Sequence, residues 1–96
     1  MRVRFFAGIR EITGCIEADI PYKETAGALA RSLCDLYGAK LEEKFFPSGY
    51  KSEKEIKLGP EIIFIINGRH IDHLGGLSAP LNPEDRVDIF PVVAGG

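Results

Sequence analysis

The chain has 96 residues and a mass of 10.6 kDa, and we expect residues 1–96 to form a single domain, too short for a two-lobed enzyme. Twelve Lys and Arg against 14 Asp and Glu give a net charge of −2, which argues against nucleic acid as a partner, because phosphate binding needs a basic excess. Apolar runs are too short for a membrane span, no secretory signal is present, and two cysteines do not make a disulfide scaffold. We therefore expect a cytoplasmic protein with no membrane partner.

The first twenty residues contain two alternating stretches. Residues 1–6 have a period of two, which predicts a strand with Val3 and Phe5 facing inward. Residues 15–20 repeat this period and predict a second strand. Turn residues lie between them, so we expect a short connection and a hairpin. The inward positions of the second strand are Ile16, Ala18 and Ile20.

An amphipathic helix is predicted next. Thr25 is a suitable N-cap, because its hydroxyl can accept a hydrogen bond from a free backbone amide. Gly38 is the expected left-handed stop. The apolar residues between them recur at spacings of three and four, and they are Ala26, Leu29, Ala30, Leu33 and Tyr37. Such a helix covers one face of a sheet.

Residues 39–61 form an insert of different composition. Half of positions 40–57 are Lys or Glu, and Pro47-Ser48-Gly49 interrupts the middle. Because the charges mix and nearly cancel, we expect a solvated surface excursion, with a short helical piece around residues 41–46.

The last third of the chain supplies the remaining strands. The apolar run 62–66 predicts a strand that is buried on both faces or meets a partner with its second face. Asn67-Gly68 then predicts a hairpin turn, and residues 86–90 the last strand. Pro91 lacks an amide and is expected to end its pairing. The order predicts an α+β fold in which one helix packs on a mixed sheet of four or five strands, with the first and last strands adjacent in the middle.

Catalytic and metal-binding patterns are weak. His70 and His73 lack further ligands nearby, so we interpret them as exposed loop residues. Cys34 belongs beside the apolar stripe of the helix, whereas Cys15 is in phase with outward residues and is expected to face solvent. No acidic pair or Cys-His motif stands out, so we expect neither an enzyme nor a bound cofactor or metal.

The chain ends in Gly95-Gly96, which packs against nothing by itself. One interpretation is a frayed terminus. The other is functional, because a chain without Cβ atoms can enter a slot barely wider than a backbone and present its carboxylate there. Residues 91–96 would then be a flexible tail that extends at most about 20 Å.

Residues 81–96 (LNPEDRVDIFPVVAGG) resemble the C-terminus of the MoaD/ThiS family of ubiquitin-like sulfur carriers, most closely the MoaD type, the small subunit of molybdopterin synthase. Residues 3–11, 67–69 and 74–77 resemble the family's opening strand and its second hairpin with the following loop. The resemblance implies a β-grasp fold. Two departures are the length of the insert 39–61 and Val92, where many MoaD-type tails carry a second proline.

The resemblance also implies a mechanism. A ubiquitin-activating-like adenylyltransferase would use ATP to adenylate the carboxylate of Gly96, and a sulfur donor protein would convert it to a thiocarboxylate. Gly95, Ala94 and Val93 would thread into the partner's active site. For the MoaD type, the large subunit of molybdopterin synthase would take the sulfur for the molybdenum cofactor. The chain itself would be a carrier and co-substrate.

Other outcomes remain open at this stage. Within the family, the sulfur could serve thiamine, tRNA thiolation or cysteine synthesis, although Phe90-Pro91 favours the MoaD type. A ubiquitin-like modifier would instead link Gly96 to lysines. A plain interaction module would have an inert tail.

A partner-binding patch is predicted next to the tail. Alternation in the last strand places Asp88 and Phe90 on the face away from the core, and Asp88 suggests that this face is solvated. Phe6 has the same outward phase on the first strand. If these strands are neighbours, the two rings form an apolar patch that continues into Pro91, which is typical of an interface anchor. The alternative is that Phe90 folds under the loop 75–80.

Overall fold

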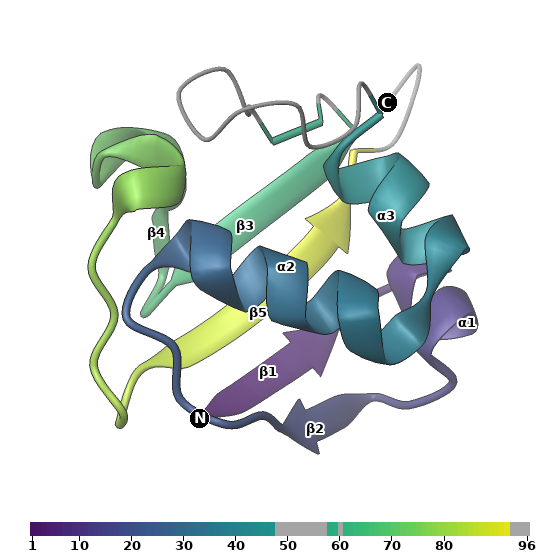
Figure 1. The fold of residues 1–96 in the computed structure, drawn as a ribbon, viewed down its shortest axis with the longest axis horizontal. Coiled ribbons are helices and arrows are strands. Elements are labelled where there is room, and N and C mark those ends of the chain that lie inside the picture. Colours follow the sequence, from purple (N-terminus) through teal and green to yellow (C-terminus); the bar gives the residue numbers. More distant parts are fainter. Residues whose placement is uncertain (48–57, 60, 93–96) are drawn as a thin grey trace.

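A five-stranded mixed sheet in the order β2-β1-β5-β3-β4 forms the centre of the computed structural model, which describes residues 1–47, 58, 59 and 61–92. β1 runs parallel to β5, and the other neighbours are antiparallel. The helix α2 crosses one face of the sheet (Figure 1). The elements are β1 (Arg2–Phe5), α1 (Gly8–Thr13), β2 (Glu17–Asp19), α2 (Ala26–Tyr37), α3 (Ala39–Phe45), β3 (Ile62–Ile66), β4 (Arg69–His70), the 3₁₀ turns η1 (Ile71–His73) and η2 (Gly76–Ser78), and β5 (Arg86–Pro91). This α+β layout confirms the predicted β-grasp fold, including the adjacent first and last strands.

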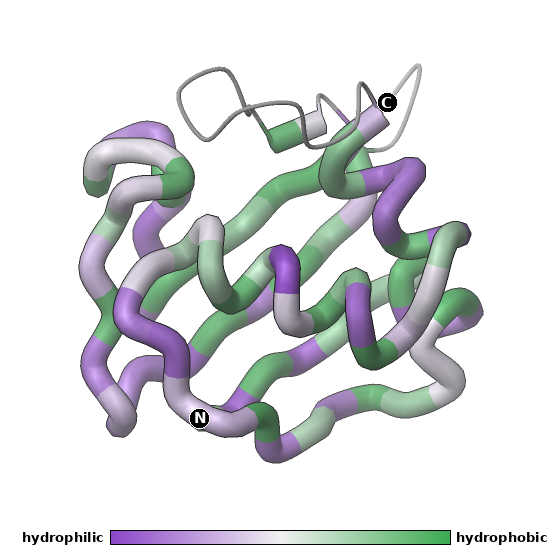
Figure 2. The backbone as a smooth tube through the Cα atoms, viewed as in Figure 1, coloured by the Kyte–Doolittle hydropathy of each residue, from purple (hydrophilic) through white to green (hydrophobic). Residues whose placement is uncertain are grey.

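The core lies between the sheet and α2. The hydroxyl of Thr25 accepts a hydrogen bond from the Ala28 amide at 3.2 Å, as predicted. Gly38 ends the helix at a positive φ of 92°, but its ψ of −167° lies outside the left-handed helical region that was predicted. β3 is hydrophobic along its whole length, whereas β1 and β5 alternate (Figure 2). The inward residues of all three strands meet the apolar stripe of α2, and the fully buried ones are Val3, Phe5, Phe64, Val87, Ile89, Leu29, Ala30 and Leu33.

The connection from β1 to β2 differs from the prediction. A short helix, α1, replaces the expected turn, and its Ile9 is buried in the core. Ile16 was expected inward but is 63% exposed. It lies one residue before β2, an edge strand, where alternation no longer guarantees that a side chain is covered. The antiparallel pairing of β1 with β2 is confirmed.

The insert was predicted to be a solvated surface excursion, but part of it belongs to the core. The predicted helical piece is α3, and its Leu41 and Phe45 are fully buried, as is nearly all of Phe46. The amide of Gly59 donates to the carbonyl of Phe45 at 2.7 Å and fixes the returning chain against the helix. The charged residues of α3 are exposed or half-buried, and they are Lys40, Glu42, Glu43 and Lys44. Residues 48–57 lie outside the described part of the chain.

The β3–β4 turn has the predicted geometry. Asn67 and Gly68 both have positive φ, 49° and 85°, as a two-residue hairpin turn requires. The Asn67 side chain also accepts a hydrogen bond from the Arg86 amide at 2.9 Å and donates to Asp85 at 2.8 Å. The turn is therefore tied to the start of β5.

The packing of α3 gives a stability prediction. Phe45→Ala should lower the free energy of unfolding by about 3–5 kcal/mol, because it removes a buried ring next to Phe64 and leaves a cavity. Glu43→Ala, an exposed position on the same helix, is the matched control and should change stability by less than about 0.5 kcal/mol. Urea denaturation of both variants measures the difference. Equal stabilities would mean that α3 is not part of the core.

Candidate functional site

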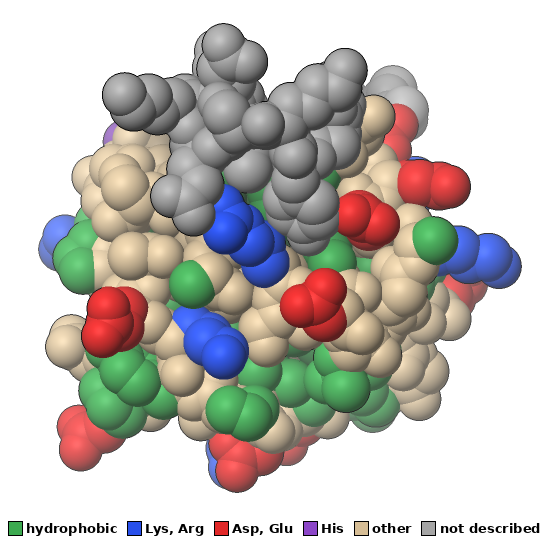
Figure 3. All heavy atoms as spheres, viewed as in Figure 1, with side chains coloured by type: hydrophobic (Ala, Val, Ile, Leu, Met, Phe, Trp, Pro, Cys, Tyr) green, Lys and Arg blue, Asp and Glu red, His purple; other side chains and the backbone are tan. Residues whose placement is uncertain are grey.

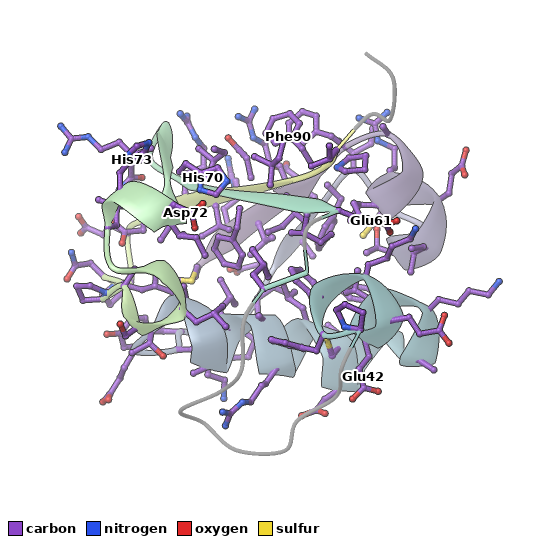
Figure 4. All side chains as sticks on the ribbon, turned by 90° about the horizontal axis from the view of Figure 1, so that it is seen from above. Glu42, Glu61, His70, Asp72, His73 and Phe90 are labelled. Atoms are coloured by element: carbon purple, nitrogen blue, oxygen red, sulfur yellow. The ribbon has the colours of Figure 1, made fainter. Side chains whose placement is uncertain are left out.

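The face of the sheet away from α2 carries an aromatic stack. The rings of Phe6 and Phe90 lie 4.1 Å apart between centroids and 10° from parallel, and both residues are half-buried. Figure 4 shows Phe90 on this side of the sheet, opposite α2 and α3. Ile63 of β3 is the register partner of Phe90 and extends the apolar surface. The sequence predicted that these two rings would meet if the first and last strands were neighbours, and β1 and β5 are neighbours in the sheet.

Phe90 does not fold under the loop 75–80. That loop packs on the other side of the sheet, against α2. The loop approaches α2 so closely at Gly27 that a Cβ atom on this residue would lie only 3.0 Å from the carbonyl oxygen of Leu77. On that helix-covered face, acidic and basic side chains are interspersed (Figure 3). The apolar surface around Phe90 therefore lies opposite a face of ordinary mixed charge.

Asp88 corrects the prediction for this face. It was expected to face solvent, yet only 7% of the residue is exposed. The guanidinium of Arg4 donates from Nε to Oδ1 at 2.7 Å and from Nη2 to Oδ2 at 3.0 Å. The same guanidinium lies 5.5 Å from the centre of the Phe6 ring. The hydrogen bond to Asp88 raises the pKa of Arg4 above its ordinary value, so the guanidinium is charged at all physiological pH values.

Strand β5 continues beyond the predicted end. Pro91 is still in register with Ile62, and the amide of Val92 donates to the carbonyl of Glu61 at 2.8 Å. The proline does not interrupt the ladder, because the hydrogen bond at this point comes from the next residue. Glu61 is also bound by Lys44 of α3 at 2.9 Å. The backbone is therefore hydrogen-bonded to its neighbours as far as Val92, two residues beyond the predicted end of the strand at Phe90. Val92 itself is 46% exposed.

The predicted functional tail follows this anchor. Val93, Ala94, Gly95 and Gly96 lie outside the described residues. Four residues beyond Val92 extend at most about 14 Å, compared with about 20 Å for a tail that starts at residue 91. The anchor thus sets a shorter reach for the terminal carboxylate than the sequence suggested.

The remaining candidate groups do not form a reactive centre. The Nδ1 atom of His70 accepts a hydrogen bond from the Asp72 amide at 3.1 Å, which is local turn bonding. In the described part of the chain no three His, Cys, Asp or Glu residues come together as metal ligands. Nor does any described helix have the length and apolar character needed to cross a membrane.

The two cysteines differ in environment. Cys34 is buried beside the apolar stripe of α2, as predicted. Cys15 is half-buried rather than solvent-facing, and its sulfur lies 3.7 Å from the hydroxyl of Tyr37. Burial, followed by this contact, raises the pKa of Tyr37 to about 12. Tyr37 also packs edge-on against Phe5, so the Cys15 contact belongs to the core rather than to a reactive site.

Comparison with known proteins identifies the family. The sequence profile of the ThiS family matches residues 3–96. Small archaeal modifier protein 3 of Haloferax volcanii is 35% identical over 98 residues, which cover 100% of this chain and 98% of that protein. The solution structure of small archaeal modifier protein 1 from Methanosarcina acetivorans superposes with a TM-score of 0.83 at 34% identity, covering 99% of this chain and 94% of that one.

A third similar structure is CysO of Mycobacterium tuberculosis, with a TM-score of 0.77 at 25% identity over 96% of this chain and 98% of that one. The three named relatives are small modifiers and CysO, so the comparisons support the family without singling out the MoaD type. The chain belongs to the ThiS family, as a non-catalytic, ubiquitin-like protein of the sulfur-carrier and small-modifier type.

Proposed function

We propose that Gly96 is the reactive residue of this protein. An adenylyltransferase of the ubiquitin-activating kind joins its carboxylate to AMP, and ATP releases pyrophosphate. Sulfur at the sulfide level then attacks the acyl carbon, AMP leaves, and a thiocarboxylate remains. The observation that carries the proposal is the sequence Val93-Ala94-Gly95-Gly96 directly after a strand that is anchored through Val92. A fixed anchor followed by thin residues suits delivery of one carboxylate into an enclosed active site.

The same activated end also serves conjugation in this proposal. A lysine amine can attack the acyl adenylate, or a thioester made from it, and form an isopeptide bond with Gly96. Two relatives that match nearly the whole chain at 34–35% identity are named small archaeal modifiers, which favours this second use of the end. We therefore place protein modification beside sulfur transfer, both downstream of one adenylation step.

Molybdopterin synthesis is a second candidate for the destination of the sulfur. The observation that favours it is Phe90-Pro91, which the sequence shares with MoaD-type tails. In that case the large subunit of molybdopterin synthase would receive residues 93–96 and use the thiocarboxylate as its sulfur source. Thiamine, thiolated tRNA and cysteine synthesis are the alternative destinations.

The docking surface proposed for these partners is the aromatic stack with its surroundings. Phe6 and Phe90 lie on the face that α2 leaves uncovered, close to the anchor at Val92. Pro91 connects the stack to this anchor, but it is the register partner of the buried Ile62 and therefore belongs to the opposite face of the sheet. A partner that receives the tail must approach this end of the molecule. Half-buried aromatic rings there provide apolar area with few side-chain rotamers to fix, as interface anchors do.

The modification of Gly96 has a direct test by mass spectrometry. Incubation with ATP, the cognate adenylyltransferase and sulfide should add the mass of one sulfur minus one oxygen, located at Gly96. Omission of ATP should leave the protein unmodified, because sulfide does not displace oxygen from a free carboxylate. A persulfide on Cys15 would instead add a whole sulfur and be removed by a reductant.

A variant that lacks Gly96 serves as control for the same experiment. It should show no sulfur gain and no lysine conjugates in cells, while its melting temperature stays near that of the wild type, since a terminal residue contributes little to stability. Sulfur gain without ATP, or none with the active enzyme, would refute the proposed function.

The stack gives a binding prediction. Phe90→Ala should weaken binding to the adenylyltransferase by roughly 1–3 kcal/mol, the usual range for an aromatic anchor. Leu36→Ala is the matched control, because Leu36 is an exposed apolar residue on α2, away from this face. Isothermal titration with each variant measures the change. Equal dissociation constants for the two variants would exclude Phe90 as an anchor.

The molybdopterin candidate has its own assay. Thiocarboxylated protein should transfer sulfur to a cyclic pterin precursor only when a molybdopterin synthase large subunit is present. Loss of the thiocarboxylate mass and formation of a dithiolene product would both be observed. Retention of the sulfur with a large subunit from the same organism would assign the carrier to another destination.

A further inference from the structure

The Arg4–Asp88 pair occupies an unusual place for an ion pair. It lies in the middle of the sheet face that α2 leaves uncovered, between the two central strands, and Asp88 is the only buried charged residue among those the structure describes. An ion pair with a buried carboxylate is weak support for stability, because two apolar residues of similar volume often do as well or better. Its presence on a face that already has an aromatic stack needs another explanation.

The surroundings of the pair follow from the strand register. Arg4 is opposite Asp88, the Phe6–Phe90 stack lies one row toward the tail, and Arg2 is opposite Arg86 one row the other way. On β3, Ile65 is the register partner of Asp88. The face therefore runs from a row of two arginines, through the ion pair, to the apolar stack and the tail anchor.

The two residues of the pair differ in their exposure to solvent and in the hydrogen-bonding groups that remain free. Asp88 is enclosed, whereas the side chain of Arg4 is 37% exposed. A guanidinium has five N–H donors, and Asp88 receives two of them. The other donors of Arg4 are available to water at the edge of the stack. A partner that covers Phe6 and Phe90 removes this water, and the lost hydrogen bonds cost free energy unless the partner supplies an acceptor.

We propose that Arg4 is a specificity-determining contact of the docking face, and that the partner places a carboxylate against it beside an apolar side chain seated on the Phe6–Phe90 stack. The inference rests on the proposed function, which supplies the adenylyltransferase as the partner. Asp88 is the positioning residue, because its bidentate contact fixes the plane and direction of the guanidinium.

A carboxylate is the acceptor that binds the remaining N–H groups of Arg4 most strongly, because hydrogen bonds between charged groups are the stronger ones. On β2, Glu17 and Asp19 are the register partners of Arg4 and Arg2, and Glu17 lies 3.7 Å from Arg2. Arg86, in the row next to Arg4, has no acidic side chain within ion-pair distance among the described residues. An acidic group that approaches Arg4 therefore also lies near Arg86. Complementary charge of this kind selects between partners and fixes the register in which they dock.

The test uses ATP–pyrophosphate exchange by the cognate adenylyltransferase, with the full-length protein as the varied substrate. Arg4→Met should raise KM by about tenfold or more at unchanged kcat, the loss expected for a charged hydrogen bond. Raised salt should shrink that ratio, because the contact is ionic. Arg69→Met is the matched control. It removes the same charge from an exposed position of β4, and its KM should stay close to that of the wild type.

A second variant separates recognition from folding. In Arg4→Met/Asp88→Leu both charges are replaced by apolar groups, so the fold should be as stable as the wild type or more so. Its KM should nevertheless be raised as in Arg4→Met. A wild-type KM for the double variant, or an equal rise for Arg69→Met, would overturn the proposal. Absence of exchange with the wild type would refute the proposed function itself and, with it, this inference.

Discussion

The parallel pairing of β1 with β5 is the contact on which the rest of the molecule depends. It joins residues more than 80 positions apart and places both strands in the centre of the sheet. The core residues of the two strands meet α2 on one side, and the outward residues form the candidate site on the other. Because closing such a long loop costs chain entropy before any contact is gained, this pairing is expected to form late in folding. The site and the fold therefore require the same step.

Sequence patterns correctly predicted those features that depend only on residues close together in the chain. The N-cap at Thr25, the stop at Gly38 and the Asn67-Gly68 turn depend on a few neighbouring residues, and the structure contains each of them. Helix α1 was not predicted, and α3 was predicted as a helix but not as part of the core, because in both cases only one or two apolar residues reach the core. Ile9 and Phe45 carry that information, and the charged residues around α3 concealed it.

The candidate site was predictable to a different extent. Alternation placed Phe6 and Phe90 on the outer face, and strand adjacency then made the stack a consequence. Alternation also placed Asp88 there, but it assigns a residue to a face and says nothing about the neighbour across the strands. Alternation in β1 also places Arg4 on this outer face, but only the parallel register joins it to Asp88. The extension of β5 to Pro91 and the hydrogen bond of Val92 were missed for the same reason, because the partners Ile62 and Glu61 lie about 30 positions earlier in the chain.

The anchoring of the tail has a mechanical consequence. A partner that draws the end of the chain into its active site exerts a force along β5, which is held by β1 on one side and β3 on the other. A force in this direction shears the β1–β5 and β3–β5 pairings at the same time. Many hydrogen bonds then share the load, instead of breaking one after another from the end of the strand. The hydrogen bond from Val92 to Glu61 is the first to bear it. The tail can thus be held under tension, during transfer or while joined to another protein, without the rest of the domain being unravelled.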